Sequence, residues 1–227
     1  MVKELRFHEL CIKGSNGKSS AKTLFILESP FDSELLEDCA CVGKTGKKMT
    51  KILGLQSDDA LGKMLNDRNQ MAKEYAVFNT FKFPLDVAVA VRMIKAGKKY
   101  DLWSKSKMPW CGLKNDEDKE IATLKREINT INSNRFCKSY YLEYKNSLMF
   151  FLQKSPNLRR IVVCGRIAQA MFESIIEGNP SFKYLKFKQK EIGDKVYEVM
   201  YTKHPSVWLS PDEGYGKKVK DALNCWP

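Results

Sequence analysis

The sequence predicts an α/β fold with a largely parallel central sheet. Short, almost wholly apolar runs, such as 22–29 and the start of 159–176, are typical of strands buried on both faces. Segments with helical spacing of apolar residues alternate with these runs, which indicates helices that connect parallel strands. The 227 residues, 43% of them hydrophobic, fit a single domain over 1–227 better than two domains.

The first half of the chain alternates strands and helices. Pro30 ends the first strand, because proline cannot donate to a strand ladder. Ser57 is a good N-cap, since acidic residues and then apolar residues at helical spacing follow it. The expected elements are a strand at 22–29, helices at 44–55 and 57–75, a strand at 75–81 and a helix at 85–99.

The second half contains a strand, a glycine turn and a helix in immediate succession, over 159–176. Residues 100–118 hold two Trp, a Pro, a Gly and many charges, so a loop is expected there. The remaining expected elements are helices near 116–132 and 134–154, strands at 183–192 and 195–205, and a helix at 212–226.

Net charge and composition narrow the class of partner. The 39 basic and 27 acidic residues give +12, which favours a polyanion, with nucleic acid as the first candidate. The alternative is a highly charged surface without a specific partner. Seven cysteines, mostly within apolar runs, fit a reducing compartment better than a disulfide framework. Without a signal peptide or a run of 18 apolar residues, we expect a cytoplasmic protein, nucleoid-associated if bacterial, with no membrane contact.

Polar residues stand where the buried strands end. In open α/β sheets, ligands bind beyond the carboxyl ends of the strands. Four segments fit that rule: 28–31, Asn79, 164–166 and 204–206. We expect them to converge on one rim of the sheet.

The run 41–48, CVGKTGKK, is similar to a phosphate-binding loop. Cys41 stands where the first glycine of a nucleoside-triphosphate loop belongs, and Lys48 stands where its Ser or Thr belongs, so an NTPase is disfavoured. A glycine- and lysine-rich loop at a helix N-terminus still binds an anion through backbone N–H groups, and a nucleic-acid phosphate suits it. The alternative is a solvated lysine loop.

Three side chains at strand ends carry functional chemistry. His204 could donate a hydrogen bond to a developing negative charge or act as acid or base, unless it only caps a turn. The amide of Asn79 presents a donor and an acceptor to a base edge, unless it only ends the strand. Glu28 interrupts an apolar run, where a carboxylate is either used or paired with a lysine. No metal site is indicated, because Cys39 and Cys41 lack a second pair.

Four motifs in order resemble the uracil-DNA glycosylase superfamily. The first is a strand, a polar turn with a fixed Pro and a Gly-x-x-Gly-Lys loop leading into a helix, here LESPFDSELLEDCACVGKTGKKM. Next come a strand ending in Asn, here YAVFN, and a strand–Gly–helix unit, here RIVVCGRIAQAMF. The last is a His-Pro-Ser motif after a late strand, here MYTKHPSVWL. The motifs cover most of the chain.

The resemblance implies a three-layer α/β/α domain with a short, mostly parallel sheet, in which 98–150 is an insertion or elaboration. It also implies a monomeric, metal-independent enzyme without a cofactor. Such an enzyme flips a base out of single- or double-stranded DNA and hydrolyses its N-glycosidic bond, leaving an abasic site. Uracil or a modified pyrimidine is the expected base.

By position, the resemblance also assigns catalytic roles. Asn79 would read the base, and His204 would bond the base oxygen where negative charge accumulates. Glu28, or a backbone group beside it, would orient water or stabilise the sugar cation. Ser29 replaces the catalytic Asp of the best-known branch, whereas Glu28 keeps the pattern of a branch with Glu one place earlier.

The resemblance also implies which residues stack on the base and which contact DNA. The aromatic residue that stacks on uracil in the family falls near Cys41, so Phe31, Phe81 or Phe83 would have to substitute for it. The residues expected to grip phosphates are Lys44, Thr45, Lys47 and Ser206, and Trp208 or Leu209 would wedge into the gap that the base leaves.

The chain also departs from the family pattern. Leu27 stands where the first motif opens with Gly, and the N-terminal segment offers only Cys11 toward the iron–sulfur cluster of one branch, so no cluster is expected. The small Cys41 and Ser29, with the additional 98–150 segment, favour a wider pocket. One alternative is therefore a glycosylase for a bulky modified base of viral DNA, in host defence. Two others are a catalytically silent DNA-binding module and a nucleotide-handling enzyme that uses the lysine loop.

Overall fold

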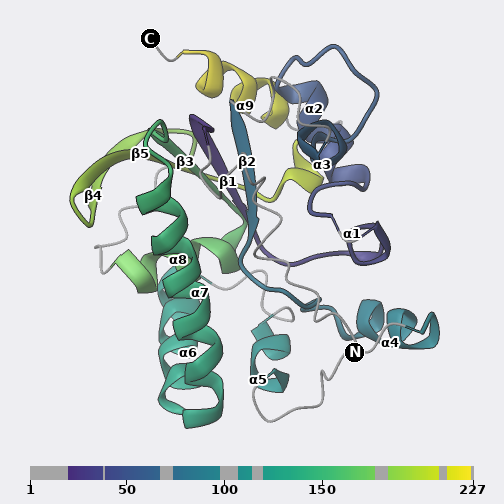
Figure 1. The fold of residues 1–227 in the computed structure, drawn as a ribbon, viewed down its shortest axis with the longest axis vertical. Helices are drawn as coiled ribbons and strands as arrows, with labels where there is room; N and C mark the ends of the chain where they lie inside the picture. The colour runs from purple at the N-terminus through teal and green to yellow at the C-terminus, as the bar shows by residue number, and fades with distance from the viewer. Residues whose placement is uncertain are drawn as a thin grey trace.

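One five-stranded sheet organises the residues that the structure describes (Figure 1). The computed structural model describes residues 20–37, 39–66, 74–97, 107–113, 120–176, 184–209 and 214–225. The strand order is β2-β1-β3-β5-β4; β4 pairs antiparallel with β5, and the other pairs are parallel. The strands are β1 (Thr23–Leu27), β2 (Tyr75–Asn79), β3 (Arg160–Cys164), β4 (Lys188–Ile192) and β5 (Lys195–Thr202).

Both faces of the sheet are buried, and side chains alternate between them. On β1, Leu24 and Ile26 enter one apolar cluster, whereas Phe25 and Leu27 enter a second cluster. A strand buried on both sides has no polar face to show, which explains the continuous apolar run in the sequence. Helices cover each face, so the expected three-layer α/β/α fold is confirmed.

The helices on the two faces come from different parts of the chain (Figure 1). The face of Leu24 and Ile26 is covered by α6 (Ile121–Ser133), α7 (Arg135–Lys154) and α8 (Arg166–Ile176). The opposite face is covered by α2 (Lys44–Ile52), α3 (Leu61–Asn66) and α9 (Tyr215–Asn224). The other described helices are α1 (Asp32–Glu37), α4 (Val87–Lys95), α5 (Met108–Cys111) and the 3-10 turn η4 (Pro205–Val207).

Side-chain caps explain where two of the helices begin. The carboxylate of Asp86 accepts a hydrogen bond from the N–H of Ala88 at 2.8 Å, at the start of α4. The side-chain oxygen of Asn134 accepts one from the N–H of Phe136 at 2.9 Å, which separates α6 from α7. Asp and Asn are favoured N-caps because they satisfy N–H groups that the helix itself leaves unpaired.

Most of the expected elements are present. Helix α1 and the 3-10 turn η4 were not expected, and there are three further differences. The helix expected from Ser57 begins at Leu61, and Ser57 instead accepts a hydrogen bond from the N–H of Asp59 in a local turn. The expected continuation of that helix over 67–73 lies outside the described residues. A short helix, α5, forms within the loop expected at 100–118, and the last two strands form an antiparallel hairpin.

The described parts of the 98–150 segment contribute to the main core. Tyr144 and Leu148 of α7 are fully buried against the sheet. The hydroxyl of Tyr140 donates to the carbonyl of Thr80 at 2.8 Å and accepts from the N–H of Lys82 at 3.1 Å. Helix α7 therefore fixes the loop that follows β2. Across the described part of the chain, no helix combines the length and apolarity needed to cross a bilayer.

Candidate functional site

The four polar segments identified in the sequence lie at one edge of the sheet. Leu27 of β1 pairs with Asn79 of β2, and Cys164 of β3 pairs with Thr202 of β5. Since β1 and β3 are also paired in parallel, the four strands end together and the expected shared rim is confirmed. Asn79 is the last residue of β2, and His204 follows β5. These are the outer two of the four strands, and three interstrand spacings separate them by roughly 14 Å.

Asn79 faces a buried carboxylate, that of Glu34, which no motif in the sequence indicated. Its Nδ2 lies 3.4 Å from Oε1 of Glu34. Asn79 is 3% exposed, and its Oδ1 has no hydrogen-bond partner among the residues that the structure describes. A buried acceptor without a partner is costly. Its position at the carboxyl rim makes Asn79 a candidate acceptor for a ligand's donor.

Glu34 ties three segments of the chain together. Besides Asn79, its carboxylate binds the N–H of Phe31 through Oε2 at 2.9 Å and the N–H of Cys41 through Oε1 at 2.6 Å. Burial raises the pKa of the Glu34 carboxyl, and the N–H donors oppose that rise. The available sequence signal was a Glu at the third position of a helix, which reaches back to the residue before it. That signal predicts a helix cap, but it does not predict the contact between Glu34 and Asn79.

Glu28 lies on the face of the sheet that α8 covers. Its Oε1 accepts a hydrogen bond from the N–H of Ile167 at 3.1 Å, at the start of α8. Gly165 has φ +92°, and a Cβ there would lie 2.3 Å from that oxygen, so the close approach requires glycine. Glu28 therefore caps α8, with Ser29 half-buried beside it. The roles of Glu28 and Ser29 toward water or the sugar stay predictions.

His204 is oriented by the turn that it precedes. Its Nδ1 accepts a hydrogen bond from the N–H of Ser206 at 3.3 Å and lies 2.9 Å from the Ser206 hydroxyl oxygen. A neutral imidazole whose Nδ1 accepts an N–H carries its own proton on Nε2. His204 thus caps η4, as the simpler interpretation predicted, and that same contact makes Nε2–H a hydrogen-bond donor.

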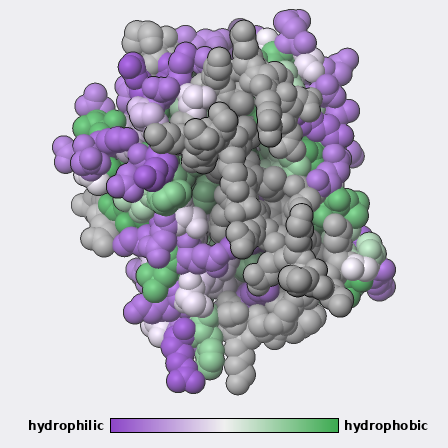
Figure 2. Space-filling view, viewed as in Figure 1, coloured by the Kyte–Doolittle hydropathy of each residue, from purple (hydrophilic) through white to green (hydrophobic). Residues whose placement is uncertain are grey.

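The lysine-rich loop and the His-Pro-Ser turn lie side by side. Lys48 donates a hydrogen bond to the backbone carbonyl of Ser206, and α2 packs against η4. These two segments, both expected to contact phosphates, are 158 residues apart in sequence. Figure 2 shows hydrophilic side chains over the upper part of the molecule, where α2 and α9 lie in Figure 1.

Helix α2 begins without a side-chain cap. Gly43 precedes it, and no side chain in the described part of the chain bonds to its first N–H groups. Lys44 and Lys47 are exposed and Thr45 is half-buried. Uncapped N–H groups with lysines around them favour an anion. Whether the loop binds a phosphate or only water stays a prediction.

A continuous path of contacts joins Asn79 to His204 through α2. Asn79 contacts Glu34, and Glu34 binds the N–H of Cys41. The sulfur of Cys41 lies 3.3 Å from that of Met49 in α2, and the residue before Met49 binds the turn of His204. The two side chains expected to read the base therefore belong to one packed unit on the α2 side of the sheet.

The residues considered for stacking on a base differ in exposure. Phe31 is 55% exposed, and the Arg92 guanidinium lies 6.0 Å from its ring centroid. Phe81 and Phe83 are buried among other aromatic rings of the core. Cys41 is also buried, and burial raises the pKa of its thiol well above the ordinary value. Of these side chains, Phe31 is the one that reaches the surface.

The interpretation of Trp208 as a wedge into DNA is wrong. Trp208 is 1% exposed, and its ring centroid lies 6.5 Å from that of Phe25 in the core. Its indole N–H donates to the carbonyl of Lys203 at 2.9 Å. A ring held in this way cannot enter a duplex. Leu209 is 40% exposed, and its role as a wedge stays a prediction.

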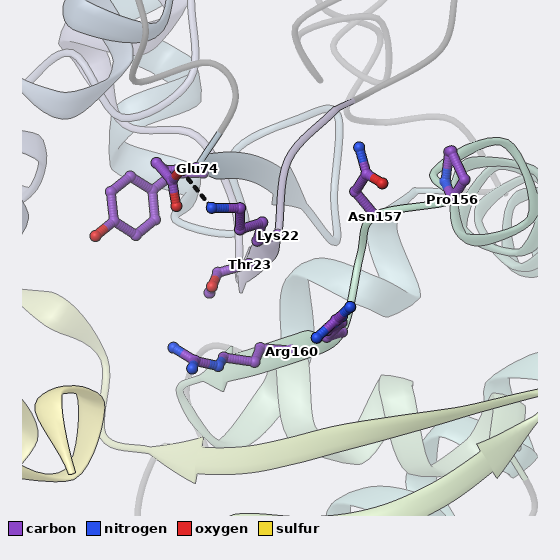
Figure 3. A pocket seen from close by; sticks show the side chains of 8 residues that line it. Lys22, Thr23, Glu74, Pro156, Asn157 and Arg160 are labelled. Atoms are coloured by element: carbon purple, nitrogen blue, oxygen red, sulfur yellow. Dashed lines mark hydrogen bonds and ion pairs between the residues drawn. The ribbon is translucent and has the colours of Figure 1, made fainter. Parts of the chain in front are cut away.

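A cavity of about 460 Å³ opens at the opposite, amino end of the strands (Figure 3). Lys22 and Glu74 form an ion pair of 2.8 Å within it. None of the predicted site residues lines this cavity, so it does not support their assignment. The lining residues are Lys22, Thr23, Glu74, Tyr75, Pro156, Asn157, Arg159 and Arg160.

Within the described ranges, no group of three or more His, Cys, Asp or Glu side chains is placed to hold a metal ion.

Comparison with other proteins adds no family assignment. No family model matches this chain, and no curated protein matches it either. Inferences about its function therefore depend on the residues at the carboxyl rim and on how they are arranged.

Proposed function

We propose that this protein is a DNA base glycosylase. It flips a uracil or modified pyrimidine from single- or double-stranded DNA and hydrolyses the N-glycosidic bond without a metal, as a cytoplasmic monomer. The observation that carries the proposal is the unit on the α2 side of the carboxyl rim. There the amide oxygen of Asn79 has no partner among the described residues. A chain of contacts through Glu34, Cys41 and Met49 links Asn79 to α2 with its lysines and to the turn that orients His204.

The chemistry requires charge stabilisation rather than a strong nucleophile. As the C1′–N bond breaks, its electron pair moves to the base and positive charge develops on the sugar. Water then bonds to C1′, and its proton ends on the base. Nε2–H of His204 donates to the base oxygen where negative charge grows, and Asn79 pairs with the base edge.

Positively charged groups at the start of α2 bind the DNA backbone. Lys44 and Lys47, with the uncapped N–H groups of α2, bind phosphates beside the flipped nucleotide, and Ser206 adds a hydroxyl from the adjacent turn. Leu209 occupies the gap that the base leaves. Glu28 provides a negative charge at the same rim, on the α8 side.

The test uses oligonucleotides that carry uracil, other deaminated bases or hypermodified pyrimidines, in single- and double-stranded form. Alkali cleavage of the DNA reports abasic sites. Asn79→Ala and His204→Ala should each abolish product while the thermal unfolding temperature is kept. The matched control is Asn157→Ala, at the opposite end of the sheet, which should cleave normally. No product on any substrate, with DNA binding intact, would remove the enzyme claim.

Two observations favour a second candidate, a catalytically silent DNA-binding module. Asn79 is 3% exposed, and the carboxylate of Glu28 is engaged as a helix cap. Such a module would bind DNA through α2 without admitting a base. It would show salt-dependent DNA binding that Asn79→Ala leaves unchanged, with no abasic sites on any substrate.

A further inference from the structure

The carboxylate of Glu34 accepts hydrogen bonds from three N–H groups, those of Phe31, Cys41 and the Asn79 side chain. We propose that Glu34 is a positioning residue that fixes the amide orientation of Asn79 and thereby selects a base that carries a hydrogen on N3. This inference rests on the proposed function, because it assigns a specificity-determining role within the same site.

Glu34 is itself rigidly held. The two backbone donors lie on either side of it in the chain, before α1 and before α2, at 2.9 and 2.6 Å. Glu34 is 8% exposed, so little water competes for these contacts. A carboxylate fixed at both oxygens presents Asn79 with an acceptor in one place.

A fixed acceptor removes the ambiguity of an amide. The oxygen and nitrogen ends of an Asn side chain are nearly equal in shape, and a 180° rotation exchanges them. Burial raises the pKa of Glu34, but its two backbone N–H donors favour the ionised form. While it is ionised, the carboxylate accepts hydrogen bonds and cannot donate, so Nδ2 of Asn79 faces Glu34. The Oδ1 of Asn79 is then turned away from Glu34, and it has no partner among the described residues.

That orientation determines which base edge fits. Uracil and related pyrimidines carry a hydrogen on N3, whereas N3 of cytosine is an acceptor. Oδ1 of Asn79 accepts from the first kind of base and faces the lone pair of the second. A buried acceptor opposite another acceptor leaves both unpaired, which corresponds to discrimination of roughly ten- to a hundredfold.

Glu34→Gln tests the inference, because a Gln amide can either accept from or donate to Asn79 and therefore permits both orientations. The matched control is Glu37→Gln, which changes an exposed, ion-paired residue of the same helix. The probes are oligonucleotides with one 2′-fluoro-2′-deoxyuridine or 2′-fluoro-2′-deoxycytidine, which resist hydrolysis. Fluorescence anisotropy gives the ratio of the two dissociation constants for each variant.

We expect the wild type and Glu37→Gln to prefer the uracil probe about tenfold or more, and Glu34→Gln to lose most of that preference. An unchanged preference in Glu34→Gln, with wild-type cleavage of uracil DNA, would overturn the inference and leave the proposed function standing. A preference that depends on Glu34 in a protein that cleaves no substrate would support the inference and overturn the glycosylase. The absence of any preference in the wild type would overturn the inference whether or not DNA is cleaved.

A spectroscopic measurement separates positioning from folding. The side-chain amide resonances of Asn79 in ¹⁵N-labelled protein are assigned by their loss in Asn79→Asp. We expect Glu34→Gln to shift them while the backbone amide spectrum of the sheet is retained. Unshifted Asn79 resonances would show that Glu34 does not orient the amide. Glu37→Gln should leave them unchanged.

Discussion

Lys48 donates a hydrogen bond to the backbone carbonyl of Ser206, 158 residues further along the chain. This contact places α2 beside the turn that orients His204, because Ser206 also donates its N–H to the His204 imidazole. A loop rich in lysine and a lone histidine motif are each weak signals in a sequence. Their contact is what turns them into one candidate surface for DNA.

Removing lysines from the start of α2 should weaken DNA binding in a salt-dependent manner. Each of Lys44→Ala and Lys47→Ala should lower the slope of log affinity against log salt by about one, because one phosphate contact is lost. Lys138→Ala, exposed on α7 at the other face of the sheet, is the control and should keep the wild-type slope. Equal losses in all three variants would show that binding depends on net charge alone.

Gly165→Ala should destabilise the fold. Its φ of +92° disfavours any side chain, and the new Cβ would lie 2.3 Å from Oε1 of Glu28. The backbone strain alone costs about 1–2 kcal/mol, and displacement of the helix cap adds to it. Thermal unfolding measures the loss. Gly112→Ala is the control, since its backbone is right-handed and a Cβ there meets nothing within 4 Å. Unchanged stability in Gly165→Ala would contradict both the backbone strain and the cost of displacing Glu28 from α8.

Glu34 should make stability depend on pH. Burial raises its pKa in the folded protein, so the folded state binds the proton more tightly than the unfolded state does. Its contribution to stability is therefore complete below the unfolded pKa and is lost as pH rises through the folded pKa. Urea unfolding across that window should show a falling free energy of unfolding, with a smaller fall in Glu34→Gln. Identical pH profiles for the two proteins would contradict the prediction.

Substitution of Trp208 should lower stability, whereas substitution of the adjacent Leu209 should lower activity and leave stability nearly unchanged. Trp208→Ala removes a fully buried ring and should cost about 3–5 kcal/mol in the free energy of unfolding. Leu209→Ala changes a 40% exposed side chain and should change stability by no more than about 0.5 kcal/mol while slowing base excision from duplex DNA. Excision from single strands is the control, because no stacked duplex has to be wedged open. Equal slowing on both substrates would remove the wedge assignment.

Local signals in the sequence predicted the fold class and most of the strands and helices. The apolar runs of β1, β2 and β3 predicted strands buried on both faces, and these three strands lie side by side and parallel within the sheet. Because parallel strands end at a common edge, the sequence also predicted that Asn79 and His204 would share a rim. These features depend on periodicity and chain direction, which are properties of neighbouring residues.

Tertiary packing decided what each side chain does at that rim. Glu34 and Asn79 are 45 residues apart, and only the placement of α1 beside β2 brings the buried carboxylate to the amide. In the same way, packing buried Trp208 in the core and turned Glu28 toward α8. Hydrogen bonds and burial between distant segments follow from three-dimensional packing, which a one-dimensional pattern does not encode.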